Sequence, residues 1–301
     1  MSNIGHNKPP LDPKETIQKN INRKLPILDR DPQYYQKTVL PSWIELSLID
    51  VCNRSCSFCP KSDPSQAPDT YQKMSHALID KLINDLTKIN FQGAFCLCGY
   101  GEPMLHKDYI EIVNKLGKIG GVEIITNGDL INKKSLLKLY ASKATKIIIS
   151  LYDGPEQIVK FKNIIKEAEI PEDFVILRDR WYSDKVDYGV KLTNRVGTVS
   201  VGNQPELKDY TNKECFYTSY QVLIDWNGDV FLCPQDWQRR QTMGNIMQTE
   251  FFDIWKGPIL SKYRKKLLSG DRKLNPCDKC NADGTVYGKK HAAAWNDLLK
   301  I

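Results

Sequence analysis

Short apolar segments alternate with amphipathic segments through the middle of the chain. The apolar segments are rich in Ile, Leu, Val and Phe, as buried strands are, and cover residues 43–49, 91–98, 122–126, 145–151 and 173–177. Between them, apolar side chains recur at helical spacing, for example at Leu78, Leu82 and Leu86. The alternation repeats every 25 to 30 residues or so, which predicts βαβ units around a parallel sheet.

The number of these units predicts the fold class. Five strands, with a weakly indicated sixth near 195–201, predict an α/β fold in which residues 41–205 form a partial (β/α)6 TIM-like barrel. The functional loops of such a barrel follow the carboxyl ends of its strands. Residues 1–40 are polar, contain proline and lack sustained periodicity, so we expect an N-terminal extension there.

After residue 205 the pattern changes to that of a smaller α+β domain, which we place at 206–286. Residues 220–233 predict a β-hairpin that turns at Asn227-Gly228. A helical stretch over 251–268 follows, interrupted at Gly257-Pro258, and residues 287–301 are predicted as a C-terminal helix.

Composition narrows the class of protein. The chain has 301 residues, of which 41% are hydrophobic and 26% charged, so it is not a wholly disordered chain. No apolar run approaches the length of a membrane helix and the start of the chain lacks the apolar core of a signal peptide, so we expect a cytoplasmic protein with no membrane partner. There, nine cysteines indicate metal or redox chemistry.

The net charge of +7 lies mostly in residues 1–40 and 287–301, so no nucleic-acid partner is expected. A short basic run, Lys262 with Arg264, Lys265 and Lys266, is predicted to be a solvated helix face.

A first group of cysteines, Cys52, Cys56 and Cys59, directly follows the first predicted strand. Three thiolates can bind three irons of a 4Fe–4S cluster and leave the fourth iron without a protein ligand. An open position of this kind is typical of a catalytic site. A zinc site and three unrelated thiols are the alternatives, and zinc needs a fourth ligand that the loop does not contain.

The CxxxCxxC spacing in this place resembles the signature of the radical S-adenosylmethionine (radical SAM) superfamily. The resemblance implies that the methionyl amino and carboxylate groups of SAM chelate the open iron. It also implies that the reduced cluster cleaves SAM to a 5′-deoxyadenosyl radical, which removes a hydrogen atom from a substrate. The cluster then needs an electron donor such as flavodoxin or ferredoxin.

The same resemblance assigns SAM contacts at the strand ends. Phe58 is expected against the adenine. Gly99, Gly101 and Glu102, in the sequence Gly-Tyr-Gly-Glu-Pro, resemble the stretch that binds the methionine ammonium, a cation that a carboxylate suits. Further contacts are expected from Thr126, Asn127 and Ser150, although Ser150 could equally be a strand-end cap.

Arg178 and Arg180 follow the fifth strand two residues apart and therefore share a face. A bidentate guanidinium suits the SAM carboxylate, to which we assign Arg178, or an anionic group of the substrate, to which we assign Arg180 and Arg195. For Arg178 and Arg180, a surface ion pair is the alternative. Cys96 and Cys98 also share a strand face and are predicted to be buried thiols outside both cysteine groups.

A second cysteine group, Cys215, Cys233, Cys277 and Cys280, supplies enough thiolates to close a metal site, either structural zinc or an iron–sulfur cluster. Beside a radical SAM barrel it resembles the SPASM extension, in the shortened twitch form that carries one auxiliary cluster. The resemblance thus implies two 4Fe–4S clusters, and the arrangement is most similar to that of the aminocyclitol dehydrogenases of the butirosin pathway.

The function that this resemblance implies is a radical SAM oxidoreductase acting on a small polar molecule such as a sugar, an aminocyclitol or a nucleotide sugar. A maturase that cross-links or epimerises a ribosomal peptide substrate is the alternative within enzymes. A non-catalytic iron–sulfur electron carrier or a zinc-stabilised binding module is the alternative from another class. No general base is identified by the sequence.

Overall fold

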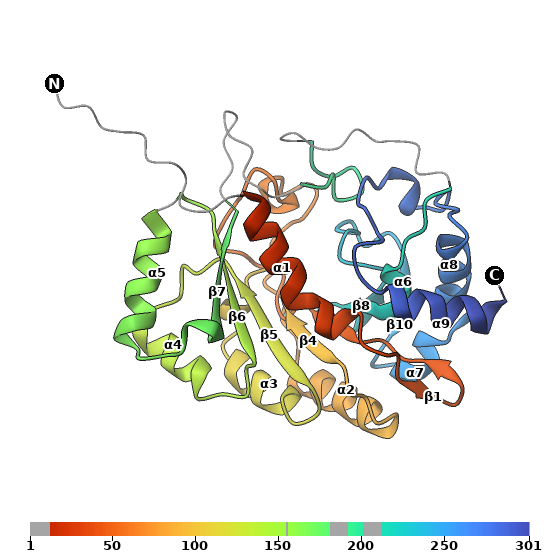
Figure 1. Cartoon of the computed structure of the whole chain (residues 1–301), viewed down its shortest axis with the longest axis horizontal. Coiled ribbons are helices and arrows are strands. Elements are labelled where there is room, and N and C mark those ends of the chain that lie inside the picture. Colours follow the sequence, from red (N-terminus) through yellow and green to blue (C-terminus); the bar gives the residue numbers. More distant parts are fainter. Residues whose placement is uncertain (1–12, 155, 181–191, 201–211, 301) are drawn as a thin grey trace.

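The computed structural model describes residues 13–154, 156–180, 192–200 and 212–300 (Figure 1). Its elements, in chain order, are α1 Pro13–Leu28, β1 Tyr34–Tyr35, β2 Thr38–Val39, β3 Trp43–Leu46, α2 His76–Lys88, β4 Ala94–Leu97, α3 Tyr109–Leu116, β5 Gly121–Thr126, α4 Lys133–Tyr140, β6 Lys146–Leu151, α5 Glu156–Glu167, β7 Val175–Asp179, α6 Tyr217–Tyr220, β8 Gln221–Ile224, β9 Asp229–Phe231, β10 Thr242–Asn245, α7 Phe251–Trp255, α8 Pro258–Leu268 and α9 Lys289–Leu299.

The main sheet has the strand order β10-β9-β8-β3-β4-β5-β6-β7. Strands β3 to β7 are parallel neighbours in chain order, which confirms the predicted α/β fold with a parallel sheet. Strand β8 pairs in parallel with β3, with Trp43 opposite Gln221 and Leu46 opposite Ile224. It also forms the predicted hairpin with β9, whose turn contains Gly228 at φ +90°. The hairpin therefore continues the sheet of the barrel.

The sixth parallel strand is β8, and the prediction of a sixth strand at 195–201 is wrong for the residues that the structure describes. Residues 195–198 form a turn, in which Arg195 has φ +45° and Val196 φ +60°. This left-handed backbone is incompatible with an extended strand. Residue 201 lies outside the described residues.

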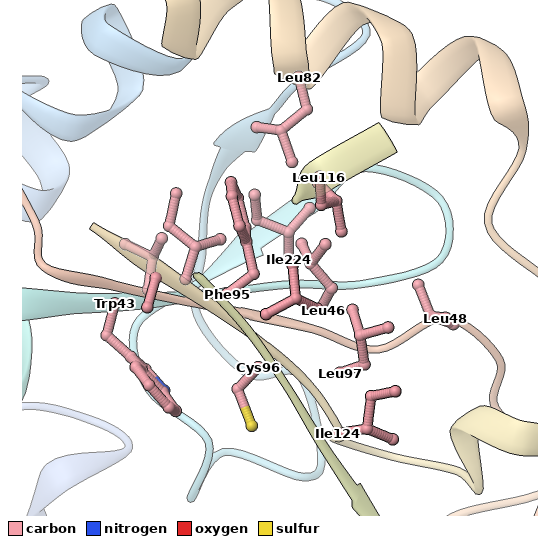
Figure 2. Close-up of a cluster of buried hydrophobic side chains, with 14 of the residues drawn as sticks. Trp43, Leu46, Leu48, Leu82, Phe95, Cys96, Leu97, Leu116, Ile124 and Ile224 are labelled. Carbon is pink, nitrogen blue, oxygen red and sulfur yellow. The ribbon is translucent and has the colours of Figure 1, made fainter. Parts of the chain in front are cut away.

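The two faces of the sheet have different neighbours. Helices α2 and α3 cover one face with the predicted apolar stripes: Leu82 and Leu116 are fully buried there, together with Phe95 of β4. Figure 2 shows these side chains on one side of the strands and Trp43 and Cys96 on the other. Cys96 is fully buried, as predicted for a thiol that behaves as a small apolar side chain, but the same prediction is wrong for Cys98, which is only partly buried.

Helix α1 crosses the strands on the face opposite α2 and α3 (Figure 1). It lies in the segment predicted only as an extension, because its sequence is polar and contains Pro26. An ion pair joins Arg23 to Glu123 of β5, and the ammonium of Lys24 lies 4.8 Å from the centre of the Trp43 ring. The helix is thereby fixed over the strands. No helix of the described chain is long and apolar enough to cross a membrane.

The predicted interruption at Gly257-Pro258 separates α7 from α8. The prediction that the basic run is a solvated face is wrong for Arg264, which is fully buried. Its guanidinium lies 4.5 Å from the centre of the Trp255 ring and 3.8 Å from that of the Trp295 ring. It also donates hydrogen bonds to the Thr218 and Trp255 carbonyls, so packing and hydrogen bonding replace hydration.

Candidate functional site

A cavity of about 410 Å³ opens at the carboxyl ends of the parallel strands. Its walls come from α1, from the loops after β3 to β7, and from the segment around β8. The predicted site residues that line it are Cys52, Cys56, Phe58, Cys59, Gly99, Gly101, Glu102, Thr126, Asn127, Arg178, Arg180 and Arg195. The three cysteines of the first group and the predicted strand-end residues, Ser150 excepted, therefore face one space.

The first cysteine group lies on the loop after β3. A hydrogen bond of 2.9 Å from the Cys59 amide to the Cys56 carbonyl closes a turn between the last two cysteines. Burial raises the pKa of the Cys56 thiol to about 12 and also raises the pKa of Cys52 and Cys59. Binding of a metal centre as thiolates therefore has to release protons.

Arg54, between Cys52 and Cys56, ties this loop to the ends of two other strands. Its guanidinium donates two hydrogen bonds to Asp129, of 2.7 and 2.6 Å, and two to Asp153, of 2.6 and 2.7 Å. Asp129 follows β5 and Asp153 follows β6. The hydrogen bonds to these carboxylates raise the pKa of Arg54 further. Arg54 thus holds the loop in a bidentate geometry that lysine cannot reproduce.

Glu102 is buried at the cavity wall, and both its carboxylate oxygens accept hydrogen bonds. Oε1 accepts from Thr126 Oγ1 at 2.7 Å and from the Met104 amide at 3.1 Å, and Oε2 accepts from the Asn127 amide at 2.8 Å. Burial nevertheless raises the pKa of Glu102 to about 6. A cationic ligand in the cavity stabilises the ionised form.

Arg178 and Arg180 both line the cavity, and the Nε atom of each is buried and has no hydrogen-bond partner among the described residues. Arg178 Nη2 donates to Ser150 Oγ at 2.8 Å, which places the Ser150 hydroxyl beneath the guanidinium. Ser150 is fully buried and is not part of the described lining. Burial lowers the pKa of Arg180 to about 9 and lowers that of Arg178, so an anion between the two is favoured.

The backbone packing around residue 101 leaves no room for a side chain, so this position requires glycine. A Cβ atom there would lie 2.3 Å from the Ile49 carbonyl oxygen and 2.6 Å from that of Val51. The loop after β4 therefore lies directly against the segment that leads to the cysteines. Next to it, the buried Tyr100 donates a hydrogen bond of 2.9 Å to the Asp236 carbonyl, which connects this loop to the second domain.

The second cysteine group also comes together. A second, small cavity is lined by Cys215, Cys233, Cys277 and Cys280. The fold thus brings together cysteines that lie up to 65 residues apart in the sequence. A Cβ atom on Gly284 would lie 2.2 Å from Cys215 Sγ, so this glycine leaves the space that the thiol occupies. Burial raises the pKa of Cys215 to about 11 and raises the pKa of the other three thiols.

Arg272 organises the backbone around these cysteines. It is buried and donates to the carbonyls of Lys213, Glu214 and Ala282 at 2.9, 2.6 and 2.8 Å. Its charge lowers the pKa of Cys215, Cys277 and Cys280 against the larger effect of burial.

The two cavities adjoin, because Tyr217 and Gln235 line both. Gln235 Oε1 accepts hydrogen bonds from Thr193 Oγ1 at 2.8 Å and from Arg195 Nη1 at 3.4 Å. Arg195 acts electrostatically on a thiol of each group, since its charge lowers the pKa of both Cys59 and Cys280.

In the described parts of the chain, no three His, Cys, Asp or Glu side chains are arranged so that they could hold a single ion. The ligands of zinc surround one point at about 2.0–2.3 Å, whereas cysteines bind a 4Fe–4S cluster at its separate corners.

Comparison with known families agrees with this geometry. A family model described as the radical SAM superfamily matches residues 46–175. A second model, SPASM, described as an iron–sulfur cluster-binding domain, matches residues 215–281. A curated relative, S-adenosyl-L-methionine-dependent 2-deoxy-scyllo-inosamine dehydrogenase of Niallia circulans, is 30% identical over 80% of this chain and 92% of its own length.

The chain belongs to the radical SAM superfamily.

Other relatives of this radical SAM enzyme differ in their sequence identity to this chain and in the share of its length that they match. A solved structure of BtrN in complex with AdoMet and 2-DOIA superposes with a TM-score of 0.69 at 26% identity, covering 84% of this chain and 98% of that chain. A GTP 3′,8-cyclase of Thermodesulfovibrio yellowstonii is 28% identical over 44% of this chain and 41% of its own length.

The enzyme uses S-adenosylmethionine and 4Fe–4S clusters as cofactors. Its residues are suited to them: three thiols face the larger cavity together with two guanidinium Nε atoms that have no hydrogen-bond partner among the described residues, and four thiols share the second, small cavity. When bound, these groups supply the 5′-deoxyadenosyl radical and one-electron redox capacity.

Sequence reasoning missed three residues of the site. Arg54 stood out only as a spacer between cysteines, because its partners are 75 and 99 residues away. Arg272 bonds to backbone carbonyls, which leave no sequence pattern. Glu45 lines the cavity from within a predicted strand, where a lone acidic residue among apolar ones was the available signal.

Proposed function

We propose that this radical SAM enzyme is a dehydrogenase that oxidises one alcohol carbon of a small amino-polyol, an aminocyclitol or amino sugar, to a ketone. The observation that carries the proposal is the Niallia circulans dehydrogenase, which is 30% identical over 92% of its own length. The similarity to BtrN with 2-DOIA supports the same substrate class. The cavity of about 410 Å³ lies within the usual range of small-molecule sites.

We assign the residues as follows. Cys52, Cys56 and Cys59 bind the cluster that receives SAM, and Cys215, Cys233, Cys277 and Cys280 bind the auxiliary cluster. These sets fall in a barrel over 41–205 and a second domain over 206–286. Phe58, Gly99, Gly101, Glu102, Thr126, Asn127 and Arg178 contact SAM, with Ser150 acting through Arg178.

Arg180 and Arg195 are assigned to the substrate. Both line the cavity, and neither forms an ion pair with a carboxylate of the described residues. Because Tyr217 and Gln235 separate the two cavities, the auxiliary site adjoins the substrate. That placement supports its use as the acceptor of the electron that an alcohol oxidation releases. A flavodoxin or ferredoxin in the cytoplasm is the electron donor that we assign to the first cluster.

The test is anaerobic turnover with a panel of amino-polyols, starting with 2-deoxy-scyllo-inosamine, and with matched polyols that lack the amino group. We expect a ketone product, formed with one 5′-deoxyadenosine per ketone. Cleavage of SAM without a ketone from any member of the panel would contradict the proposed function. Modification of a short peptide instead would favour the peptide maturase.

A further inference from the structure

The oxidation proposed above needs a proton acceptor. Conversion of a CH–OH group to a ketone removes a hydrogen atom from carbon, a proton from oxygen and one electron. On the proposed function, the 5′-deoxyadenosyl radical derived from SAM takes the hydrogen atom and an oxidised 4Fe–4S cluster takes the electron. The proton must go to a basic group that reaches the substrate oxygen.

The described lining of the cavity offers two carboxylates, Glu45 and Glu102, and no histidine. Glu102 is committed elsewhere: its Oε1 accepts two hydrogen bonds and its Oε2 a third, from Thr126, Met104 and Asn127. A carboxylate held in this way, and assigned above to SAM, is not free to reach the substrate oxygen and accept its proton.

The Glu45 carboxylate has unused capacity to accept hydrogen bonds. It lies on β3 between Leu223 of β8 and Cys96 of β4. Strand alternation puts its side chain on the face of Trp43 and Cys96, opposite the face that α2 and α3 cover, and Figure 2 shows that face for these two neighbours. Its residual exposure is 7%, and it lines the cavity.

The two oxygens of Glu45 are held differently. Oε1 accepts a hydrogen bond of 3.1 Å from Trp43 Nε1, which fixes the orientation of the carboxylate. Oε2 has the Cys98 thiol at 3.5 Å, and a thiol is a weak donor. Glu45 forms no ion pair with another described residue. A hydrogen bond with Cys96, together with burial, raises the pKa of the Cys98 thiol far above its usual value, so the thiol remains protonated and does not compete as a base.

We propose that Glu45 is the catalytic base of the dehydrogenation. After hydrogen-atom removal, the substrate carries a carbon radical next to its hydroxyl group. The O–H bond breaks, the proton forms a bond with Glu45 Oε2, and the electron pair stays on the substrate oxygen. The resulting ketyl radical anion is a stronger reductant than the neutral radical, so loss of its electron yields the ketone. The inference rests on the proposed function.

The test is Glu45→Gln, which keeps an acceptor for Trp43 Nε1 and removes the basic oxygen. Glu167→Gln, on the exposed face of α5, is the matched control for loss of a carboxylate. Each protein, reconstituted with iron and sulfide, is given SAM, reductant and the amino-polyol that the wild type oxidises. We measure iron content, 5′-deoxyadenosine and ketone, and record freeze-quenched EPR spectra.

We expect E45Q to retain its iron and to form 5′-deoxyadenosine, while ketone formation falls about 100-fold or more and a substrate-radical signal accumulates. Glu45→Asp is expected to recover part of the ketone, and it also serves if E45Q fails to load its clusters. E167Q is expected to match the wild type.

Three results overturn the proposal or separate it from the proposed function. Ketone formation by E45Q at the wild-type rate contradicts the proposed role of Glu45 and leaves the proposed function intact. A raised KM with an unchanged ratio of 5′-deoxyadenosine to ketone also contradicts it, because Glu45 then binds substrate without taking the proton. A wild type that forms no ketone contradicts the proposed function, and the role of Glu45 falls with it.

Discussion

Arg54 and Asp129 form a two-bond ion pair, with N···O distances of 2.7 and 2.6 Å, that joins the first cysteine loop to the end of β5. The side chains are 19% and 29% exposed, so the pair is shielded from solvent only in part. The pair to Asp153 is more open, because the Asp153 side chain is 54% exposed. The loop that carries Cys52, Cys56 and Cys59 is thus positioned by a residue with no role in binding metal.

We therefore expect Arg54→Ala to loosen this loop. Loss of charge-assisted hydrogen bonds at a half-exposed site should lower the free energy of unfolding by about 1–2 kcal/mol. Iron retained by the first cluster should fall more than iron retained by the second. Chemical denaturation and iron analysis of Arg54→Ala, Arg54→Lys, Asp129→Asn and Asp153→Asn measure this.

Among these variants, Asp153→Asn should have the smallest effect, since its carboxylate is the most exposed of the three side chains. Arg54→Lys should be intermediate because it keeps the charge and loses the bidentate geometry. Equal iron in both clusters of Arg54→Ala would contradict the positioning role.

The pH dependence of SAM binding should report on Glu102. Burial raises its pKa to about 6, so the free carboxylate becomes protonated as the pH falls through that value. Protonation removes the negative charge beside the amino end of SAM, so below pH 6 the Kd should rise about tenfold more per pH unit than it does in a variant without this carboxylate. Titration calorimetry between pH 5 and 8 gives the curve.

Glu102→Gln is the control for this effect. It keeps an oxygen for the Thr126 hydroxyl and lacks the titrating charge, so its Kd should be weaker throughout and lack the additional rise below pH 6. A wild-type curve that runs parallel to that of Glu102→Gln between pH 5 and 7 would rule out Glu102 as a ligand of the amino group.

The assignment of the cysteines predicts the metal content of single variants. The wild type should bind about eight irons, and either Cys52→Ala or Cys233→Ala should retain about four. The two variants differ in one respect: Cys52→Ala should lose the change in the EPR spectrum on adding SAM, and Cys233→Ala should keep it. Cys96→Ala is the control, since this fully buried thiol belongs to neither group. Loss of four irons from Cys96→Ala would show that the grouping is wrong.

The sequence predicted the parts of the molecule that repeat locally. Strand and helix periodicity gave β3 to β7 and the stripes of α2, and cysteine spacing predicted both groups of thiols. Pairing between strands that are distant in the sequence could not be predicted in this way. Strand β8 pairs with β3 across about 180 residues, and no local pattern encodes that partner. Two other features were missed for comparable reasons. Helix α1 is polar with an internal Pro26, and Glu45 gains its meaning from the cavity that distant segments enclose.

The central claim is that the cluster bound by Cys52, Cys56 and Cys59 cleaves SAM reductively. The direct measurement is 5′-deoxyadenosine released when anaerobically reconstituted, reduced protein is mixed with SAM, with Cys52→Ala as the control. The account predicts 5′-deoxyadenosine and methionine from the wild type and neither from the control. A wild-type protein that carries both clusters and releases no 5′-deoxyadenosine would contradict it.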